Sequence, residues 1–392
     1  MMSRVRAHNT ANRPSDRSCI MFRGFHCQIN PDGYIAIPHK SEGPFLHSND
    51  AKQNCFVTFF FHHSRHTFDE YPCTISVFSD LGLQISGMIK RQMLKKHIST
   101  IETMMTINKK LKGIFILFVT YIVALTAGIL IFHSIKNLIP LYYAIFIANA
   151  AATVLTWMSG VIFKSASIYD PYWSVQTPAI MIALIIMTGT CTPGTLIFLT
   201  FVLFWAIRLT ANFIAGFHDI SYVDWRYKML KEKTGSLFQI VNLFGICMFP
   251  TTVVYIASLP AFAYILENRD FSLLNTIGLA VIFLGTMLEL FADRQMKTFI
   301  KTRKDRSEII RTGLWKYSRH PNYLGEILFW YGVALVYILP DLNHLPYLAG
   351  AVINHLMFLF ISVPLAEKNM QKYKSNFEQY KKEVRMFLPL KK

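Results

Sequence analysis

The chain has 392 residues, 53% of them hydrophobic, and its mean hydropathy is +0.32. The apolar residues are clustered in long runs, which excludes an ordinary soluble protein and indicates a polytopic membrane protein whose partner is the lipid bilayer. The formal net charge is +17. The basic residues stand between the apolar runs, where they suit membrane headgroups, so we expect no nucleic-acid partner.

Residues 1–112 differ from the rest of the chain. They are polar, prolines interrupt any periodicity, and the longest apolar run, Cys55 to Phe61, is too short to span a bilayer. No signal peptide is evident, because no apolar segment follows a basic start. We therefore expect a poorly ordered extension. Met104 or Met105 is an alternative start of the working protein, since a short basic segment and an apolar helix follow.

The histidines and cysteines predict no metal site. The six cysteines form no CxxC pair, and Cys191 and Cys247 lie in or beside apolar segments. His62, His63 and His66 have few carboxylates nearby, which favours a solvated loop.

From Gly113 onward the sequence predicts an all-α, polytopic transmembrane helical bundle, so residues 113–392 form a multi-spanning membrane domain. About eight spans are expected, at residues 113–133, 141–163, 177–190, 195–215, 237–265, 273–292, 324–339 and 347–366. The fifth is long, and we expect Pro250 and Pro260 to kink or divide it.

The charges of the loops test this number of spans. Loops 216–236 and 293–323 and the tail after Leu365 are strongly basic, whereas the opposite loops hold little more than Lys136 and Arg269. By the positive-inside rule, both termini are then cytoplasmic and the number of spans is even. We expect the endoplasmic reticulum as the location if the protein is eukaryotic.

The segment 311–332 joins a basic, turn-forming half to an apolar half. Pro321 suits the first turn of a helix, because its φ is fixed and it lacks an N–H. Four polar residues stand at offsets 0, 3, 4 and 7, which share one face of a helix: Arg319, Asn322, Tyr323 and Glu326. Polar groups at the membrane are costly unless they face a cavity, a ligand or each other. We predict a ligand site here, with an interfacial cap as the alternative.

Further polar residues stand in or beside the spans, where they are functional candidates. They are Arg208 with Asn212, the ladder Glu289, Asp293 and Lys297, the segments 170–174 and 224–227, and His355. The ladder is either an ion-paired helix end or part of a ligand cradle. Tyr172 and Trp173 suit the membrane interface, and we expect His355 to hydrogen-bond a neighbouring helix.

Most of these groups lie near the expected cytoplasmic face, and together they suit a large anionic cofactor. Positive charge comes from Lys297, Lys301, Arg311 and Arg319, and directional hydrogen bonds come from Asn322, Tyr323 and Glu326. Guanidinium groups bind phosphate bidentately. Neither GxGxxG nor a P-loop is present, so any nucleotide binds among the membrane helices rather than in a soluble Rossmann domain.

The octet RHPNYLGE, Arg319 to Glu326, resembles the signature of the steroid 5-alpha-reductase-like membrane superfamily, and in particular its DUF1295 branch. The segments 170–174, 224–227 and 289–297, Arg208, and the tail with Tyr380 are similar to that branch and occur in the expected order. The resemblance covers about residues 113–392, and the leader falls outside it.

This resemblance implies an NADPH-dependent reductase of an activated carbon–carbon double bond in a lipophilic substrate, such as a steroid, an enoyl lipid or a polyprenol. By it, Asn322 and Glu326 contact the nicotinamide end, Asp293 and Tyr380 lie elsewhere along the dinucleotide, and Arg319 suits a phosphate. The expected cofactor-binding set is Asp293, Arg319, His320, Asn322, Tyr323, Glu326 and Tyr380. The catalytic acid is not placed by motif, and Tyr142, Tyr143, Asp170 and Tyr172 are positional candidates only.

Two alternatives stay open. One is a membrane methyltransferase of the isoprenylcysteine or phospholipid type, in which Glu367 and Tyr373 could serve S-adenosylmethionine. The other is a non-catalytic lipid- or sterol-binding protein that retains the fold. Asn322 with Glu326, in the form Asn-Tyr-x-Gly-Glu, favours the reductase.

Overall fold

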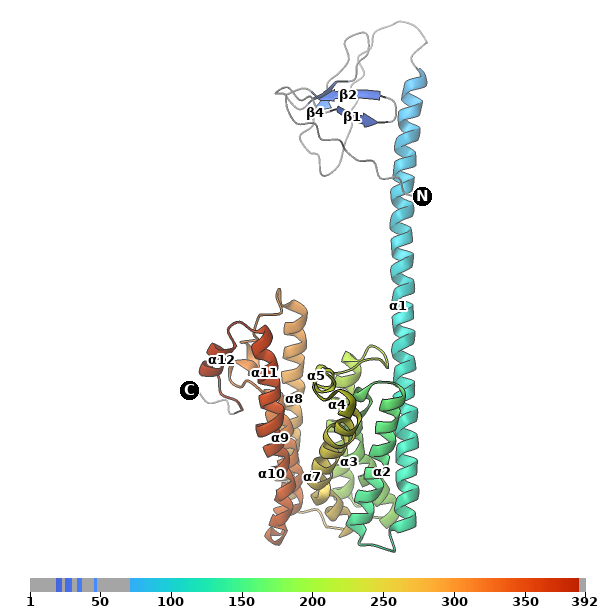
Figure 1. The fold of residues 1–392 in the computed structure, drawn as a ribbon. Coiled ribbons are helices and arrows are strands. Elements are labelled where there is room, and N and C mark those ends of the chain that lie inside the picture. The colour runs from blue at the N-terminus through green and yellow to red at the C-terminus, as the bar shows by residue number, and fades with distance from the viewer. Residues whose placement is uncertain (1–18, 23–24, 30–33, 37–45, 48–70, 388–392) are drawn as a thin grey trace. The chain divides into compact units, whose positions relative to one another are not determined.

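The computed structural model describes residues 19–22, 25–29, 34–36, 46–47 and 71–387 (Figure 1). The chain divides into two compact units, Met1–Gly87 and Met88–Lys392. The predicted loop with His62, His63 and His66 lies outside the described residues.

The first unit contains a small antiparallel sheet. Its strands are β1 (Cys19–Phe22), β2 (Phe25–Ile29), β3 (Tyr34–Ala36) and β4 (Leu46–His47), and each pairs with the next in sequence order. Cys19 is paired with Gln28, and Ile35 is paired with Leu46. The proline-interrupted pattern of the extension does not predict these short strands.

The second unit is helical. Its elements, with the whole of the helix that enters it, are α1 (Tyr71–Ile135), α2 (Leu141–Ile162), η1 (Ala166–Tyr169), α3 (Tyr172–Thr188), α4 (Pro193–Gly216), α5 (Trp225–Thr234), η2 (Gly235–Leu237), α6 (Phe238–Val241), η3 (Asn242–Met248), α7 (Phe249–Leu266), α8 (Asn275–Thr302), η4 (Gly313–Lys316), α9 (Pro321–Ile338), η5 (Leu342–Tyr347), α10 (Leu348–Met357), η6 (Phe358–Ser362), α11 (Val363–Tyr373) and α12 (Phe377–Glu383). Because α1 begins at Tyr71, the expected boundary at residue 112 falls inside a helix.

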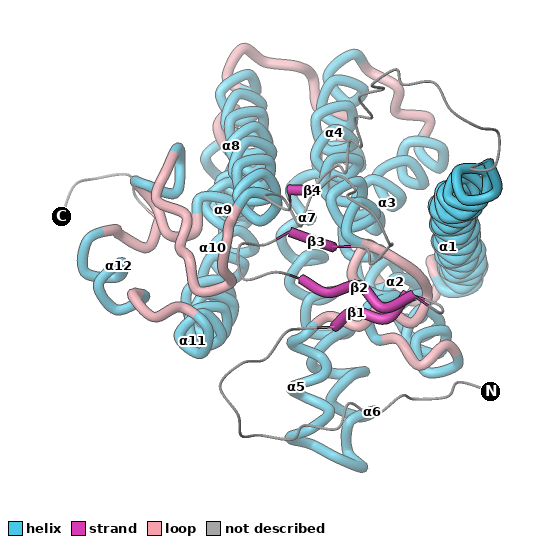
Figure 2. Tube along the Cα trace, turned by 90° about the horizontal axis from the view of Figure 1, so that it is seen from above, coloured by secondary structure: helices cyan, strands magenta, loops and turns pink. Residues whose placement is uncertain are grey.

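Within the described residues, seven helical segments are long and apolar enough to cross a membrane, so the protein is an integral, multi-pass membrane protein. These segments are Lys95–Ile135, Leu141–Ile162, Ala166–Thr188, Pro193–Gly216, Trp225–Leu266, Asn275–Thr302 and Leu342–Tyr373. The seventh predicted span, 324–339, is not among these segments. It corresponds to α9, whose first turns carry Asn322 and Glu326 and are therefore less apolar. Figure 2 shows the helices end-on.

The helix α9 runs antiparallel along α8 through a glycine-lined contact, so it crosses the same depth. A Cβ atom added at Gly278 would lie 2.4 Å from the backbone nitrogen of Val336, and one added at Gly332 would lie 2.6 Å from that of Ile282. At such separations only a hydrogen fits, because real Cβ contacts are longer. Close backbone approach of this kind is characteristic of membrane helix pairs, whose association depends on packing rather than on the hydrophobic effect.

The long fifth span is interrupted where a proline was expected to disturb it. The seven residues of η3, Asn242–Met248, form a π-helix directly before Pro250, which lies in the first turn of α7. A π-turn leaves room for the ring of a proline that cannot donate an N–H. Pro260, in contrast, lies inside α7, which continues to Leu266.

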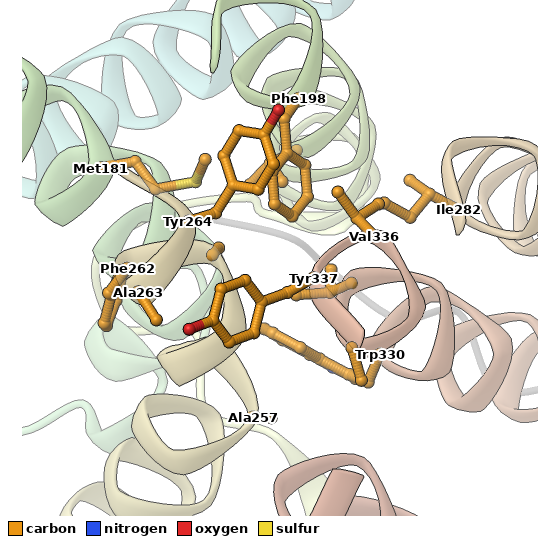
Figure 3. Packing of buried hydrophobic residues seen from close by; sticks show 14 of the residues in the cluster. Met181, Phe198, Ala257, Phe262, Ala263, Tyr264, Ile282, Trp330, Val336 and Tyr337 are labelled. Atoms are coloured by element: carbon orange, nitrogen blue, oxygen red, sulfur yellow. The ribbon is translucent and has the colours of Figure 1, made fainter. Parts of the chain in front are cut away.

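The apolar core lies among α3, α4, α7, α8 and α9 (Figure 3). Trp205 of α4 stacks on Phe329 of α9, with ring centroids 4.2 Å apart and an interplanar angle of 13°. Trp330 meets both rings edge-on. This aromatic group forms one end of the core, and the indole N–H groups of both tryptophans point toward the polar residues described below.

The α8–α9 contact yields a stability prediction. We expect Gly278→Leu to destabilise the folded protein by about 1–3 kcal/mol, since the larger side chain must push the two helices apart. The matched control is Gly216→Leu, at an exposed helical glycine with no atom within 4 Å of an added Cβ. Thermal unfolding of the detergent-solubilised protein, followed by loss of the monodisperse peak in size-exclusion chromatography, measures the difference. Equal melting temperatures for the two variants would contradict the packing argument.

Candidate functional site

A cavity of about 600 Å³ opens among α3, α4, α5, α7, α8, α9, α10 and α11. This volume is within the range of small-molecule and cofactor sites, roughly 300–1,000 Å³. Its polar part is lined by Asp170, Arg208, Asn212, Asp224, Arg226, Tyr227, Glu289, Asp293, Asn322 and Glu326. Its apolar part is lined mainly by residues of η3, α7, α10, η6 and α11.

Arg208 is at the centre of the polar wall. Its guanidinium is buried and pairs with Glu289 and, at 3.0 Å from Nη1 to Oδ2, with Asp293. Asn212, one turn further along α4, donates to the same Asp293 oxygen at 3.0 Å, and Asn322 of α9 donates to the other at 3.4 Å. Arg208 and Asn212, four residues apart on α4, therefore face Glu289 and Asp293, four residues apart on α8. Asp293 joins three helices.

Glu326 of α9 lies beside this group. Its carboxylate is buried and accepts hydrogen bonds from Nε1 of Trp205 at 2.9 Å and from Nε1 of Trp330 at 2.8 Å. The preceding Gly325 lets α8 approach, since an added Cβ there would lie 2.5 Å from Cγ of Glu289. The aromatic end of the core thus fixes a carboxylate at the cavity wall.

A second part of the wall joins two segments that are far apart in the sequence. The phenol of Tyr227 on α5 donates to Oδ1 of Asp170, which precedes α3. Asp224 caps α5 by accepting from the backbone N–H of Arg226 at 2.9 Å, and its own N–H donates to Ser167 at 2.8 Å. The segments 170–174 and 224–227, identified separately in the sequence, therefore form one surface of the cavity.

The charge of the cavity differs from the expected cation-rich pocket. Among the residues that the structure describes, five carboxylates line it, against two guanidinium groups. The carboxylates belong to Asp170, Asp224, Glu289, Asp293 and Glu326, and the guanidinium groups belong to Arg208 and Arg226. Of the expected cations, Lys297 and Lys301 are exposed further along α8, and Arg311 pairs with Glu383 at the surface. The described residues of the wall thus offer more hydrogen-bond acceptors than positive charge.

Four of the seven residues predicted to bind a cofactor line this cavity: Asp293, Asn322, Tyr323 and Glu326. The structure places Arg319, His320 and Tyr380 elsewhere. The helix α9 begins only at Pro321, so Arg319 precedes it and does not share its face with the others. The prediction from helical offsets was wrong for Arg319, because it assumed that the helix already includes this residue.

Arg319 and His320 hold the C-terminal tail instead. Nε of Arg319 pairs with Oε1 of Glu367 at 2.8 Å, and its Nη1 donates to the carbonyl of Val384. The backbone N–H of Arg319 donates to the carbonyl of Arg385 at 2.9 Å. Nε2 of His320 lies 3.1 Å from the same Glu367 oxygen, and burial lowers the pKa of His320 although this carboxylate opposes the shift.

His320 nevertheless touches the cavity indirectly. Its ring stacks on that of Tyr323, with centroids 5.2 Å apart and an interplanar angle of 11°. Tyr380 belongs to the tail itself, in α12, where its hydroxyl donates to the carbonyl of Trp315 at 2.7 Å and burial raises its pKa to about 12. The first residues of the octet therefore hold the tail and the later ones line the cavity, and Tyr323 contacts both groups through its stacking on His320.

The other residues singled out in the sequence differ in whether they reach the cavity. Among the positional candidates for an acid, Asp170 lines the cavity, Tyr172 is buried and donates to Asn149 at 3.2 Å, and Tyr142 and Tyr143 line a second hollow of about 490 Å³. Tyr373 lies at the surface, with the guanidinium of Arg306 4.2 Å from its ring centroid. The prediction for His355 is confirmed, because its Nδ1 lies 3.3 Å from the hydroxyl of Tyr331 on α9.

Two lining residues had no role assigned from the sequence. Tyr227 stood inside a segment that was singled out, but nothing in the pattern shows that it reaches Asp170. Asn354 lines the cavity from α10 and is 2% exposed. An amide inside an apolar span is costly, and this signal was available in the sequence beside His355.

The tail contacts yield a second prediction. Glu367→Ala leaves the buried guanidinium of Arg319 without its carboxylate, a change that costs about 3–5 kcal/mol at buried ion pairs. We expect faster trypsin cleavage at Lys381, Lys382 and Arg385, detected by mass spectrometry of the digest. Glu378→Ala is the matched control, since Glu378 is an exposed residue of the same region that hydrogen-bonds Gln371. Equal cleavage rates in the two variants would show that the ion pair does not hold the tail.

Comparison with known proteins confirms the family of the resemblance, over a shorter stretch than the expected residues 113–392. Residues 156–384 match a family described as a protein of unknown function, DUF1295. An uncharacterised protein of Schizosaccharomyces pombe is 26% identical over 148 residues, which cover 32% of this chain and 43% of that protein, so the chain spans less than half of the relative's length. No solved structure matches the chain. The matched residues include every member of the polar wall, and the chain belongs to the DUF1295 family.

Proposed function

We propose that the cavity is the active site of a membrane-embedded, NADPH-dependent reductase of an activated carbon–carbon double bond in a lipophilic substrate. The observation that carries the proposal is the meeting of two sets of residues in one cavity. Asn322, Asp293 and Glu326 form one wall, and the hydrogen-bonded pair Tyr227–Asp170 forms the other. The resemblance of the octet to the steroid 5-alpha-reductase-like superfamily supports the same reaction.

The donor and acceptor set of the polar wall fits the nicotinamide–ribose half of the cofactor. A carboxamide needs both an acceptor and a donor, which Asp293 and Asn322 supply together. Ribose hydroxyls donate to carboxylates, and Glu289 and Glu326 are fixed side by side on the wall. The guanidinium of Arg226, whose side chain is 44% exposed, suits a phosphate at the mouth.

The chain's own residues supply orientation and a proton. Bound reduced nicotinamide supplies a hydride. The phenol of Tyr227, held by Asp170, places a shared proton at the cavity surface, where the pair acts as general acid toward a substrate carbonyl and the adjacent carbon. The indole N–H groups of Trp205 and Trp330 hold the carboxylate of Glu326 in place at the cavity wall.

The orientation in the membrane follows from the basic residues around this end of the bundle. Residues 217–220 lie against Gly113 of α1, and the tail lies against Ser318 before α9, so the basic loops and both ends of the bundle gather here. Under the positive-inside rule this end faces the cytoplasm, with both termini on that side. The cavity then opens toward cytosolic NADPH, in the endoplasmic reticulum if the protein is eukaryotic.

One observation favours a second candidate. The excess of carboxylates over guanidinium groups suits a cationic ligand, and the sulfonium of S-adenosylmethionine is cationic. Against it, Glu367 pairs with Arg319 and Tyr373 lies at the surface, so neither of the residues suggested for a methyltransferase faces the cavity. Direct binding measurements separate the two cofactors.

Asn322→Ala should weaken NADPH binding about tenfold, which corresponds to the roughly 1.4 kcal/mol of a lost hydrogen bond in a buried site. The measurement is NADPH fluorescence titration of the full chain in lipid nanodiscs. Asn343→Ala, at an exposed residue of η5 beyond the opposite end of α9 from the octet, is the control and should bind as the wild type does. Saturable binding of S-adenosylmethionine without any binding of NADPH would replace the reductase with the methyltransferase. Binding of neither would leave a lipid-binding protein.

Tyr227→Phe should abolish turnover while leaving NADPH affinity unchanged, because it removes the proton donor and keeps the ring. General acids contribute about 10²–10⁴-fold to a rate. Cells that lack the protein should accumulate a lipid two hydrogens short of its partner, seen by untargeted lipidomics. Wild type and the exposed-site control Tyr317→Phe should restore the lipid profile. Full restoration by Tyr227→Phe would remove this residue from the chemistry.

A further inference from the structure

The apolar part of the cavity lies in a wedge between α7 and α10. The two helices touch closely at one point, where an added Cβ at Gly350 would lie 2.5 Å from the carbonyl of Ile256. Going from this contact toward the polar wall, Val254 and Pro250 of α7 and Asn354 and Met357 of α10 line the cavity. The helices therefore separate, and an apolar arm of the cavity fills the space between them. Figure 1 shows α10 beside α7.

Both helices become π-helical where the arm widens. On one side, η3 contributes Gly245 and Ile246, and on the other η6 contributes Phe358 and Ile361. π-Helical segments are rare in proteins, and those that occur are often found at functional sites. Both segments belong to helices that cross the membrane, and Phe244 and Phe360 beside the arm are 63% and 69% exposed. The surface that they cover faces hydrocarbon, so the arm borders the bilayer.

Gly245 leaves this border open. It lines the cavity, and an added Cβ would meet only Cγ1 of Val241, at 3.8 Å. Unlike Gly278 or Gly350, it is not required by a close helix contact. A larger side chain here would occupy the arm rather than disturb the bundle, so Gly245 sets the width of the arm.

Asn354 provides an independent sign of a ligand. Its side-chain oxygen is buried and has no hydrogen-bond partner among the described residues. A buried acceptor without a donor costs about 1–3 kcal/mol, and the residue lines the cavity between Val254 and Met357. A ligand hydroxyl or amide N–H in the arm would satisfy it.

We infer that the arm is a substrate subsite that takes the hydrocarbon of a membrane lipid, entering from the bilayer between η3 and η6. The lipid carries a hydroxyl or amide N–H that donates to Asn354, and Gly245 is the residue that determines which breadth of hydrocarbon is accepted. The inference deepens the proposed function and rests on it for the reacting end of the lipid, which reaches Asn322 and the Tyr227–Asp170 pair in the same cavity.

The test is photolabelling of the full chain in phosphatidylcholine nanodiscs. The probe is hexadecanol that carries a mid-chain diazirine and a terminal alkyne, and its methyl ether is the matched probe without a donor. We expect labelled peptides to cover residues 245–254 and 354–365, and excess hexadecanol to compete. Gly245→Phe should lower this labelling about tenfold, a loss of roughly 1.4 kcal/mol in binding free energy. Gly216→Phe, at an exposed glycine with no atom near an added Cβ, should leave it unchanged.

Two further variants keep the outcome unambiguous. Met357→Trp narrows the arm from the opposite wall and replaces Gly245→Phe if that variant does not fold. Asn354→Leu should lower labelling by the alcohol but not by the methyl ether. Labelling that is unchanged by Gly245→Phe and Met357→Trp, with NADPH still bound, would overturn the subsite and leave the reductase intact. Loss of labelling in a protein that never binds NADPH would retain the subsite and remove the reductase.

Discussion

The arrangement of the site depends on one buried cation. Arg208 lies inside the bundle, where an unpaired guanidinium would be very costly, and its cost is offset only because Glu289 and Asp293 approach from α8. Asn212 and Asn322 then complete the hydrogen bonds of Asp293. Three helices that could slide on one another as apolar surfaces are thereby held in a single register. Well-packed apolar residues would stabilise such a contact as effectively. We therefore attribute the presence of these polar residues to the charged and hydrogen-bonding groups that they place at the cavity surface.

The polar wall requires the glycine contact beside it. The helices α8 and α9 approach so closely that Gly325 and Glu289 are in contact, and this approach carries Glu326 to the same wall. On its other side, Glu326 is bound by two tryptophans of the apolar core. Helix packing in the membrane interior therefore determines the electrostatics of the cavity, because a change in the separation of α8 and α9 would move the carboxylate of Glu326. The π-helical segments η3 and η6, in contrast, line the apolar arm of the cavity between α7 and α10.

Much of this fold follows from the sequence, because hydrophobic run length is nearly sufficient to locate membrane helices. The predicted spans 141–163, 195–215 and 324–339 agree closely with α2, α4 and α9. The small sheet near the N-terminus and the start of α1 at Tyr71 do not follow, since neither leaves a long apolar run. In the site, pairs spaced one turn apart, such as Glu289 and Asp293, could be placed on one face. The contact of Tyr227 with Asp170 could not, because it joins residues 57 apart through tertiary packing.

The residues of the octet are consecutive in the sequence but serve two different structural roles. Its residues follow one another in sequence, but the chain turns from an extended segment into a helix at Pro321. Before the turn, Arg319 pairs its backbone with the tail and its side chain with Glu367. After it, Asn322 and Glu326 face the cavity. His320 links the two halves, since one ring nitrogen contacts Glu367 and the ring face supports Tyr323. Docking of the tail and the shape of the cavity wall are consequently coupled through the stacked pair of His320 and Tyr323.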